Sequence, residues 1–218
     1  DKFLHEIINI KKIFRNISVK TIFKDRKKFE TEVVWCVACR LAMNTGGLIY
    51  ALENDLLAFA DGSNKEQTPG RDYLAATAEN FPSVVDRLKE FAREHAVEFV
   101  TPVYEFGSRE ERRAKLRELG FDIDYLSMDH GKGIKGMMTK DIFSRSQPMC
   151  LSGWLIHWKR NLFGKLDRQD EEETLDYVIY KQENIVRDYI KDYFQKKNID
   201  LEDLIQERKK LIKKGFES

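Results

Sequence analysis

The chain is most informative at Leu56-Leu57-Ala58-Phe59-Ala60-Asp61-Gly62-Ser63-Asn64, where a short apolar run ends abruptly in polar turn residues. The apolar run predicts a buried strand, and Gly62, Ser63 and Asn64 are residue types that favour a turn after it. Asp61 is therefore expected at the carboxyl end of a sheet, the edge at which open α/β folds bind ligands. An acid in that place can coordinate a cation or orient a water. An Asp and an Asn that only stabilise the turn would give the same sequence, and this simpler interpretation stays open.

The residues that follow alternate between helical and strand patterns. A helix capped by Ser83 is expected first, and then a strand over 97–106. A second helix is expected from Ser108 to Leu119, with Gly120 as its stop, and a further strand over 121–126. This alternation with short links predicts an α/β fold of three layers, with a mainly parallel sheet joined by right-handed crossovers.

The residues before this region contain apolar positions among lysines. They predict an N-terminal helix, followed by a basic connector over 24–28. The segment 31–44 is apolar enough to be buried, and Gly46-Gly47 is expected to break it. Residues 1–50 are therefore assigned to an N-terminal extension of the α/β domain, which spans 51–168.

The residues after 168 predict a C-terminal helical extension, 169–218. One long amphipathic helix is expected from Glu173 to Phe194, after an acidic start at 170–173 that favours the helix dipole. A second helix is expected to begin at the capping Asp200 and to stop at Gly215. We expect these helices to bury their apolar stripe against the chain's own N-terminal helix or against a partner protein.

The overall composition limits the functional classes. The chain has 218 residues, a net charge of +1 and three cysteines. The near-neutral charge means that any nucleic-acid surface must be local. No apolar run is long enough to span a bilayer, so no membrane partner is expected. An odd number of cysteines favours a reducing compartment, either the cytoplasm or an organelle reached after removal of a targeting segment.

Short motifs after the apolar run carry a resemblance to a known family. They are Asp61-Gly62-Ser63-Asn64, Lys132-Gly133-Ile134, Asp141, Leu151-Ser152-Gly153 and Gly164-Lys165. On these motifs, residues 56 to about 166 resemble the NYN family of PIN-like ribonuclease domains. The resemblance implies an RNA substrate and a group of carboxylates around Mg²⁺ or Mn²⁺ ions that activate water. It gives Asp61 and Asp141 the catalytic and metal-binding roles.

Two departures from the family pattern remove acids from the expected metal site. Lys135 stands where the family carries an acid, and 154–157 (Trp-Leu-Ile-His) stands where further acids would continue the pattern. Asp61 and Asp141 alone would hold a metal only weakly, and Lys135 would repel it. The resemblance therefore implies an incomplete metal site, with no cofactor unless an active nuclease uses Mg²⁺ or Mn²⁺.

An incomplete metal site of this kind can still bind RNA. Lysines near the former metal site would hold phosphates directly, and two tryptophans interleaved with cations could stack on bases. The residues expected to bind nucleic acid are Asn64, Lys132, Lys135, Lys140, Trp154, Trp158, Lys159 and Arg160. The alternative, that the tryptophans belong to the core and the cations to a solvated face, stays open.

The function expected from this pattern is RNA binding or assembly of a ribonucleoprotein. One alternative is an active metal-dependent ribonuclease that takes further acids from Asp124 or Asp129. Another is a thioredoxin-like thiol oxidoreductase, because Trp35-Cys36-Val37-Ala38-Cys39 resembles the Trp-Cys-x-x-Cys sequence of that family. A purely structural module that binds protein partners through its terminal helices is the last alternative.

Overall fold

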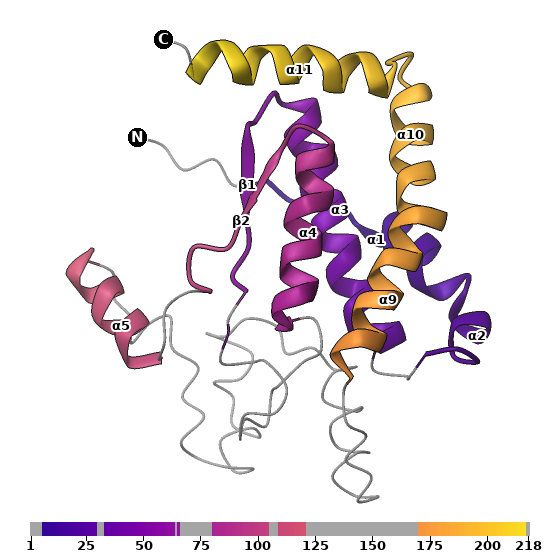
Figure 1. Ribbon diagram of the computed structural model, residues 1–218, viewed down its shortest axis with the longest axis horizontal. Coiled ribbons are helices and arrows are strands. Elements are labelled where there is room, and N and C mark those ends of the chain that lie inside the picture. The colour runs from indigo at the N-terminus through magenta and orange to yellow at the C-terminus, as the bar shows by residue number, and fades with distance from the viewer. Residues whose placement is uncertain are drawn as a thin grey trace, which may run out of the picture. The chain divides into compact units, whose positions relative to one another are not determined.

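The computed structural model describes residues 6–29, 33–63, 65, 80–104, 109–120 and 170–216, with side chains omitted for residue 33 and for 212–216. In these ranges the protein is mostly helical and contains a small two-stranded parallel sheet (Figure 1). The chain divides into two compact units, Asp1–Tyr104 with Gln169–Ser218 and Glu105–Arg168. The three-part domain division expected from the sequence stays a prediction.

The sheet consists of β1 (Ala58–Ala60) and β2 (Glu98–Val100), joined by helix α4 (Pro82–Glu94). Ala58 lies opposite Glu98 in a parallel register, and the rings of Phe59 and Phe99 stack with centroids 4.9 Å apart. The predicted parallel pairing is confirmed for these two strands. The second strand is shorter than predicted, because the chain turns at Thr101, whose carbonyl accepts a hydrogen bond from the Tyr104 N–H at 3.0 Å.

The N-terminal segment is helical, as predicted, but is broken into short pieces. These are α1 (Lys11–Phe14), the π-helical turn η1 (Arg15–Val19) and α2 (Ile22–Asp25). Ile13, Ile17 and Phe29 are buried in the core, whereas the lysines and arginines of the segment are exposed. A second π-helical turn, η2 (Val33–Val37), leads directly into helix α3 (Ala38–Glu53).

The prediction that Gly46-Gly47 breaks the buried N-terminal segment is wrong. Helix α3 runs through both glycines without interruption. A Cβ atom on Gly46 would stand 2.9 Å from the Ile10 side chain, and one on Gly47 would stand 3.0 Å from the ring of Phe59. The glycines therefore allow the chain before α1 and strand β1 to approach α3 closely, a reason that only the folded structure reveals.

The C-terminal extension is helical, as predicted. Helix α9 (Glu171–Lys181), the π-helical turn η7 (Gln182–Val186) and α10 (Arg187–Gln195) follow one another without a break. Helix α11 (Leu201–Phe216) then extends one residue past the predicted stop at Gly215. Asp170 and Asp200 cap α9 and α11, because each carboxylate accepts hydrogen bonds from backbone N–H groups two and three residues further on. Among the described helices, none is long and apolar enough to cross a membrane.

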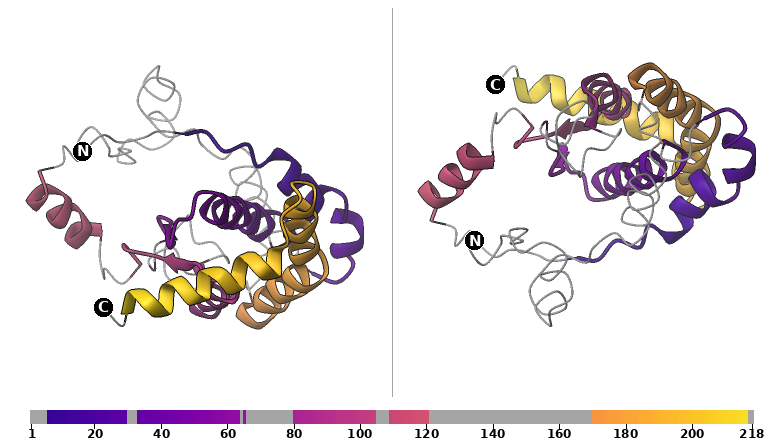
Figure 2. Two further views of the ribbon diagram at one scale, coloured as in Figure 1. Left: turned by 90° about the horizontal axis from the view of Figure 1, so that it is seen from above. Right: turned by 90° about the horizontal axis from the view of Figure 1, so that it is seen from below.

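The apolar stripe of α9–η7–α10 is buried within the chain itself, as expected, whereas in α11 Leu201 and Leu204 are half-buried and Leu211 is 65% exposed. Ile190 and Phe194 have no exposed surface, and burial of each side chain contributes roughly 2 kcal/mol. The α9–η7–α10 helices contact α4 on one side and the N-terminal turns η1 and η2 on the other (Figures 1 and 2). Whether a partner protein also binds the terminal helices stays a prediction.

The start of α4 and the end of α5 were both predicted from single residues. Helix α4 begins at Pro82 with Phe81 as its N-cap, so the prediction that Ser83 caps it is wrong. Proline suits the first turn because it has no N–H to leave unpaired. The Ser83 hydroxyl instead donates to Glu171 Oε1 at 2.7 Å. In the second unit, α5 (Arg109–Glu118) is followed by Gly120 at φ +81°, which confirms Gly120 as the stop; the proposed cap Ser108 lies outside the described residues.

Helix α11 crosses the amino ends of the two strands (Figure 1). Its buried Arg208 donates from Nε to the carbonyl of Ala96 at 3.4 Å and from Nη2 to the carbonyl of Leu56. These carbonyls lie in the chain just ahead of β2 and β1. Arg208 therefore holds the amino ends of both strands in place. The carboxyl ends of the strands, where Asp61 lies, are not covered by this contact.

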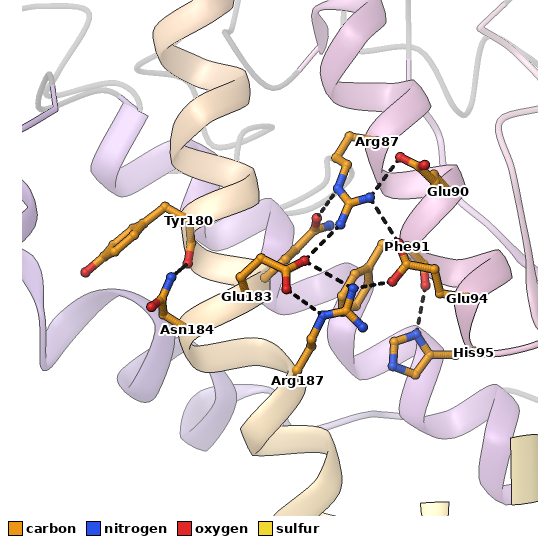
Figure 3. Close-up of polar contacts among 10 residues, drawn as sticks. Arg87, Glu90, Phe91, Glu94, His95, Tyr180, Glu183, Asn184 and Arg187 are labelled. Carbon is orange, nitrogen blue, oxygen red and sulfur yellow. Dashed lines mark hydrogen bonds and ion pairs between the residues drawn. The ribbon is translucent and has the colours of Figure 1, made fainter. Parts of the chain in front are cut away.

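An ion-pair network fastens α4 to the C-terminal helices (Figure 3). Arg87 on α4 lies 3.3 Å from Glu183 of η7, and Arg187 of α10 pairs with Glu94 of α4. Both guanidinium groups also lie over the ring of Phe91, at 5.9 and 5.1 Å from its centroid. Because α4 connects the two strands, this network holds the sheet against the C-terminal extension.

Candidate functional site

Asp61 lies directly after β1, at the carboxyl end of the parallel sheet, as the sequence predicted. Its backbone N–H donates to the carbonyl of Val100 at 3.2 Å, so the pairing with β2 extends one residue beyond the strand. The Asp61 side chain is 29% exposed. The carboxylate is therefore held at the rim of the sheet and remains accessible to solvent.

The Asp61 carboxylate has two kinds of partner. Oδ1 accepts a hydrogen bond from the Ser63 N–H at 2.9 Å and a second one from the Ser63 hydroxyl, which is the geometry of an Asx turn. Oδ2 lies 3.1 Å from Nη2 of Arg40, a residue of α3. Asp61 thus stabilises the turn, as the simpler interpretation held, and also forms an ion pair that the sequence analysis did not predict.

Arg40 connects the parts of this rim. Its side chain is 6% exposed, its Nη1 donates to Asn80 Oδ1 at 3.1 Å, and its Nη2 also contacts the Ser63 hydroxyl. A guanidinium is always charged and is costly to bury unless its charge and its N–H groups are matched. The contacts to Asp61, Ser63 and Asn80 match the charge and the two terminal nitrogens of Arg40, an arrangement that a lysine could not reproduce.

Asn80 and Tyr104 extend the arrangement to the end of β2. The Tyr104 hydroxyl donates to the backbone carbonyl of Asn80 at 3.0 Å, and both residues are buried. We call Arg40, Asp61, Ser63, Asn80 and Tyr104 the Arg40 cluster. It joins helix α3, the turn after β1, the chain two residues before α4 and the turn after β2 at one edge of the sheet.

The chemistry of the Arg40 cluster differs from that of a metal centre. Metal-dependent phosphodiester hydrolysis needs several carboxylates whose negative charge is balanced by the ion. Here the charge of Asp61 is already balanced by Arg40. In the part of the chain that the structure describes, no three His, Cys, Asp or Glu side chains come together as metal ligands. Asp61 could bind a divalent ion only by displacing the guanidinium or by tolerating it as a neighbour.

Asp61 is the only one of the predicted site residues that falls within the described ranges. Asp141, the second predicted metal ligand and catalytic acid, lies outside them. The same holds for the predicted nucleic-acid-binding residues, Asn64, Lys132, Lys135, Lys140, Trp154, Trp158, Lys159 and Arg160. Whether Asp61 and Asp141 face one cleft therefore stays a prediction.

The cysteines of the oxidoreductase alternative are both described. Cys36 lies in η2 and Cys39 in the first turn of α3, within one helical run from Val33 to Glu53. A thioredoxin-like nucleophile lies at the N-terminus of a helix that follows a strand. Cys36 lies almost a full turn into the helical run, and the nearest described element before this run is the helix α2. This placement gives the oxidoreductase alternative no support.

Arg40 is the residue that sequence reasoning missed, although a signal was present. It is the only charged residue between Val33 and Met43, a segment that is otherwise apolar and was expected to be buried. A single charge in a buried segment requires a partner, because few arginines are buried unpaired. That requirement pointed to an acid elsewhere in the chain, but the sequence did not say which one.

Comparison with protein-family models, with curated proteins and with solved structures finds no match to this chain. A functional proposal therefore rests on the geometry of the Arg40 cluster and on the sequence motifs between Asp61 and Lys165.

Proposed function

We propose that this protein binds RNA, alone or within a ribonucleoprotein, through a NYN/PIN-like α/β core whose metal site is incomplete and does not cleave RNA. The observation that supports an incomplete, inactive metal site is the ion pair between Arg40 and Asp61. RNA as the partner is supported by the resemblance of residues 56 to about 166 to the NYN family.

The ion pair opposes metal binding for electrostatic reasons. A divalent ion on the Asp61 carboxylate would lie close to a guanidinium that is held 3.1 Å from the same group. At about 4 Å and an effective dielectric constant of about 20, the repulsion between a divalent and a monovalent cation amounts to roughly 8 kcal/mol. Lys135, where the family has an acid, would add to this repulsion if the predicted cleft forms.

The fold proposed for the core goes further than the two strands described. The order β1–α4–β2 is a strand–helix–strand unit with parallel strands, and α5 is followed by the apolar alternation of residues 121–126. A third parallel strand there would repeat the unit and build the three-layer sheet of the PIN-like fold. The proposal keeps an intracellular location, which the cysteine content favours.

Binding and cleavage of RNA by the full chain test this proposal. The purified protein is mixed with a fluorescein-labelled single-stranded RNA, and binding is followed by anisotropy while cleavage with Mn²⁺ is followed on a denaturing gel. We expect binding that weakens with added salt and no Mn²⁺-dependent cleavage. Cleavage by the wild type that disappears in Asp61→Asn would overturn the proposal in favour of an active ribonuclease. Absence of any RNA binding would remove RNA as the partner.

A further inference from the structure

Residues 11–28 concentrate positive charge on the surface of the N-terminal segment. This stretch contains eight basic residues and one acid, Asp25. The basic residues are Lys11, Lys12, Arg15, Lys20, Lys24, Arg26, Lys27 and Lys28, and the side chains of all of them are exposed. We call residues 11–28 the basic segment. Because the whole chain has a net charge of only +1, positive charge is strongly concentrated here.

The single acid of the basic segment does not neutralise this surface. Asp25 is 1% exposed, and its Oδ2 pairs with Lys181 of α9, which is also buried. The Thr21 hydroxyl donates to the same oxygen at 2.7 Å. Among the described residues, no acidic side chain forms an ion pair with any of the exposed cations of the segment. Asp25, the only acid of the basic segment, is paired with the buried Lys181, so the exposed cations of the segment remain available to a binding partner.

An exposed aromatic ring lies among these charges. The Phe23 side chain is 84% exposed and sits between Lys20 and Lys24 in the sequence, and Val19 is also exposed. Cations beside an accessible aromatic ring are the combination by which proteins hold single-stranded nucleic acids, with phosphates on the cations and a base stacked on the ring. Successive backbone hydrogen bonds over residues 21–29 hold Phe23, Lys24 and Lys27 in α2 and the turns that follow it.

A membrane surface is the other polyanion to consider. Helices that lie on membranes insert a whole apolar face into the bilayer. In the basic segment, Ile13 and Ile17 are buried in the protein core, as is Phe29 just beyond it. Within the segment only Val19 and Phe23 remain to enter a bilayer, and the exposed Ile7 and Ile8 just before it lie outside any helix, so no continuous apolar helix face is available for stable insertion. The distribution of side chains therefore favours a nucleic acid.

We propose that the basic segment holds the phosphate backbone of single-stranded RNA and that Phe23 stacks on one of its bases. This inference rests on the proposed function for the identity of the partner, and it adds a contact surface on the N-terminal extension to the one predicted on the α/β core.

The test uses the full chain with matched charge variants. The triple variant Lys20→Gln, Lys24→Gln, Lys27→Gln is compared with Lys191→Gln, Lys196→Gln, Lys210→Gln, which removes the same charge from exposed positions of the C-terminal helices. Affinity for a fluorescein-labelled oligouridylate of about 16 nucleotides is measured by anisotropy between about 50 and 200 mM KCl. All six side chains are exposed, so both variants should melt at the wild-type temperature.

Loss of three phosphate contacts should lower the slope of log affinity against log salt by about two, at roughly 0.7 per contact. The control variant should keep the wild-type slope. Phe23→Ala should weaken binding by roughly tenfold and leave the slope unchanged, because stacking carries no charge.

The possible failures can be told apart. If the wild type binds RNA and both triple variants bind with the wild-type slope, the inference is wrong and the proposed function stands. If the wild type does not bind RNA, both are wrong. If the wild type binds phosphatidylserine vesicles in preference to RNA, and only the basic-segment variant loses that binding, the segment is a membrane-binding surface and the inference is overturned.

Discussion

Two acid–base pairs in this protein have similar partners and different surroundings. The Lys181–Asp25 pair is sealed, with side chains 0% and 1% exposed, and it ties the N-terminal segment to α9. The Arg40–Asp61 pair lies at the rim of the sheet, where the arginine is buried and the aspartate is 29% exposed. An ion pair closed to solvent can act only on the fold, whereas one that opens to solvent can also meet a ligand. Burial, rather than residue type, therefore separates the structural pair from the candidate site.

Breaking the sealed pair should have the largest effect. Asp25→Ala would leave the Lys181 ammonium buried without its counter-charge, and we expect the free energy of unfolding to fall by about 3–5 kcal/mol in urea denaturation. The double variant Asp25→Leu, Lys181→Met should recover most of this loss, because two apolar side chains need no counter-charge. A single variant as stable as the wild type would show that the pair is not sealed.

Removing the guanidinium at the rim should cost less. Arg40→Met would remove the hydrogen bonds that Arg40 donates to Asn80 Oδ1 and Asp61 Oδ2. Asp61 Oδ1 keeps its hydrogen bonds from Ser63 and water can reach the carboxylate, so we expect a loss of about 1–3 kcal/mol by the same measurement. Arg40→Lys keeps the charge, but its single nitrogen cannot contact Asp61 and Asn80 as the two guanidinium nitrogens do. The stability of this variant should fall between those of Arg40→Met and the wild type. Equal stability of Arg40→Met and the wild type would contradict the contacts assigned to Arg40.

His95 sharpens the comparison, because it is buried and no described acidic side chain forms an ion pair with it. Its Nδ1–H donates to the carbonyl of Phe91 at 2.8 Å, and burial lowers the pKa of the imidazole below 6.5 (Figure 3). Below about pH 6.5 the imidazole of His95 binds a proton more readily in the unfolded chain than in the folded one. The stability that neutral His95 supplies is therefore present at pH 7 and above and is lost as the pH falls through the folded-state pKa. Melts of wild type and His95→Gln from pH 8 to pH 5 should diverge in this direction, and parallel curves would show that His95 is not buried in its neutral form.

A pair on the surface gives the smallest expected effect and serves as a control. Arg93 and Glu98 lie 3.0 Å apart with both side chains well exposed. Exposed pairs contribute between about 0 and 1 kcal/mol, so Glu98→Gln should change the free energy of unfolding by less than about 0.5 kcal/mol. A loss as large as that of Arg40→Met would mean that exposure does not decide the strength of these pairs.

The sequence predicted the features that depend on neighbouring residues. Asp61 at the end of β1, the cap at Asp200 and the stop at Gly120 all follow from backbone chemistry within a few residues. Asp170 was expected only as part of an acidic helix start, and α9 begins at Glu171, two residues before the predicted Glu173. The parallel pairing of β1 and β2 followed from the strand–helix–strand pattern.

The sequence did not predict the features that depend on distant residues. Gly46 and Gly47 resembled a helix break because their reason, close approach to Ile10 and Phe59, is tertiary. The partner of Arg40 lies 21 residues away, and that of Lys181 lies 156 residues away, so no local pattern could identify either acid. The second half of the predicted metal site, Asp141, lies outside the described residues and stays a prediction.

The central claim is that the ion pair with Arg40 prevents Asp61 from binding a divalent metal ion. A measurement of Mn²⁺ binding tests it most directly. Electron paramagnetic resonance of aqueous Mn²⁺ reports the free ion, and its signal falls when a protein binds the metal. We predict that the wild-type chain leaves the signal unchanged at millimolar Mn²⁺ and that Asp61→Asn behaves identically. Stoichiometric loss of the signal with the wild type, restored in Asp61→Asn, would contradict the assignment.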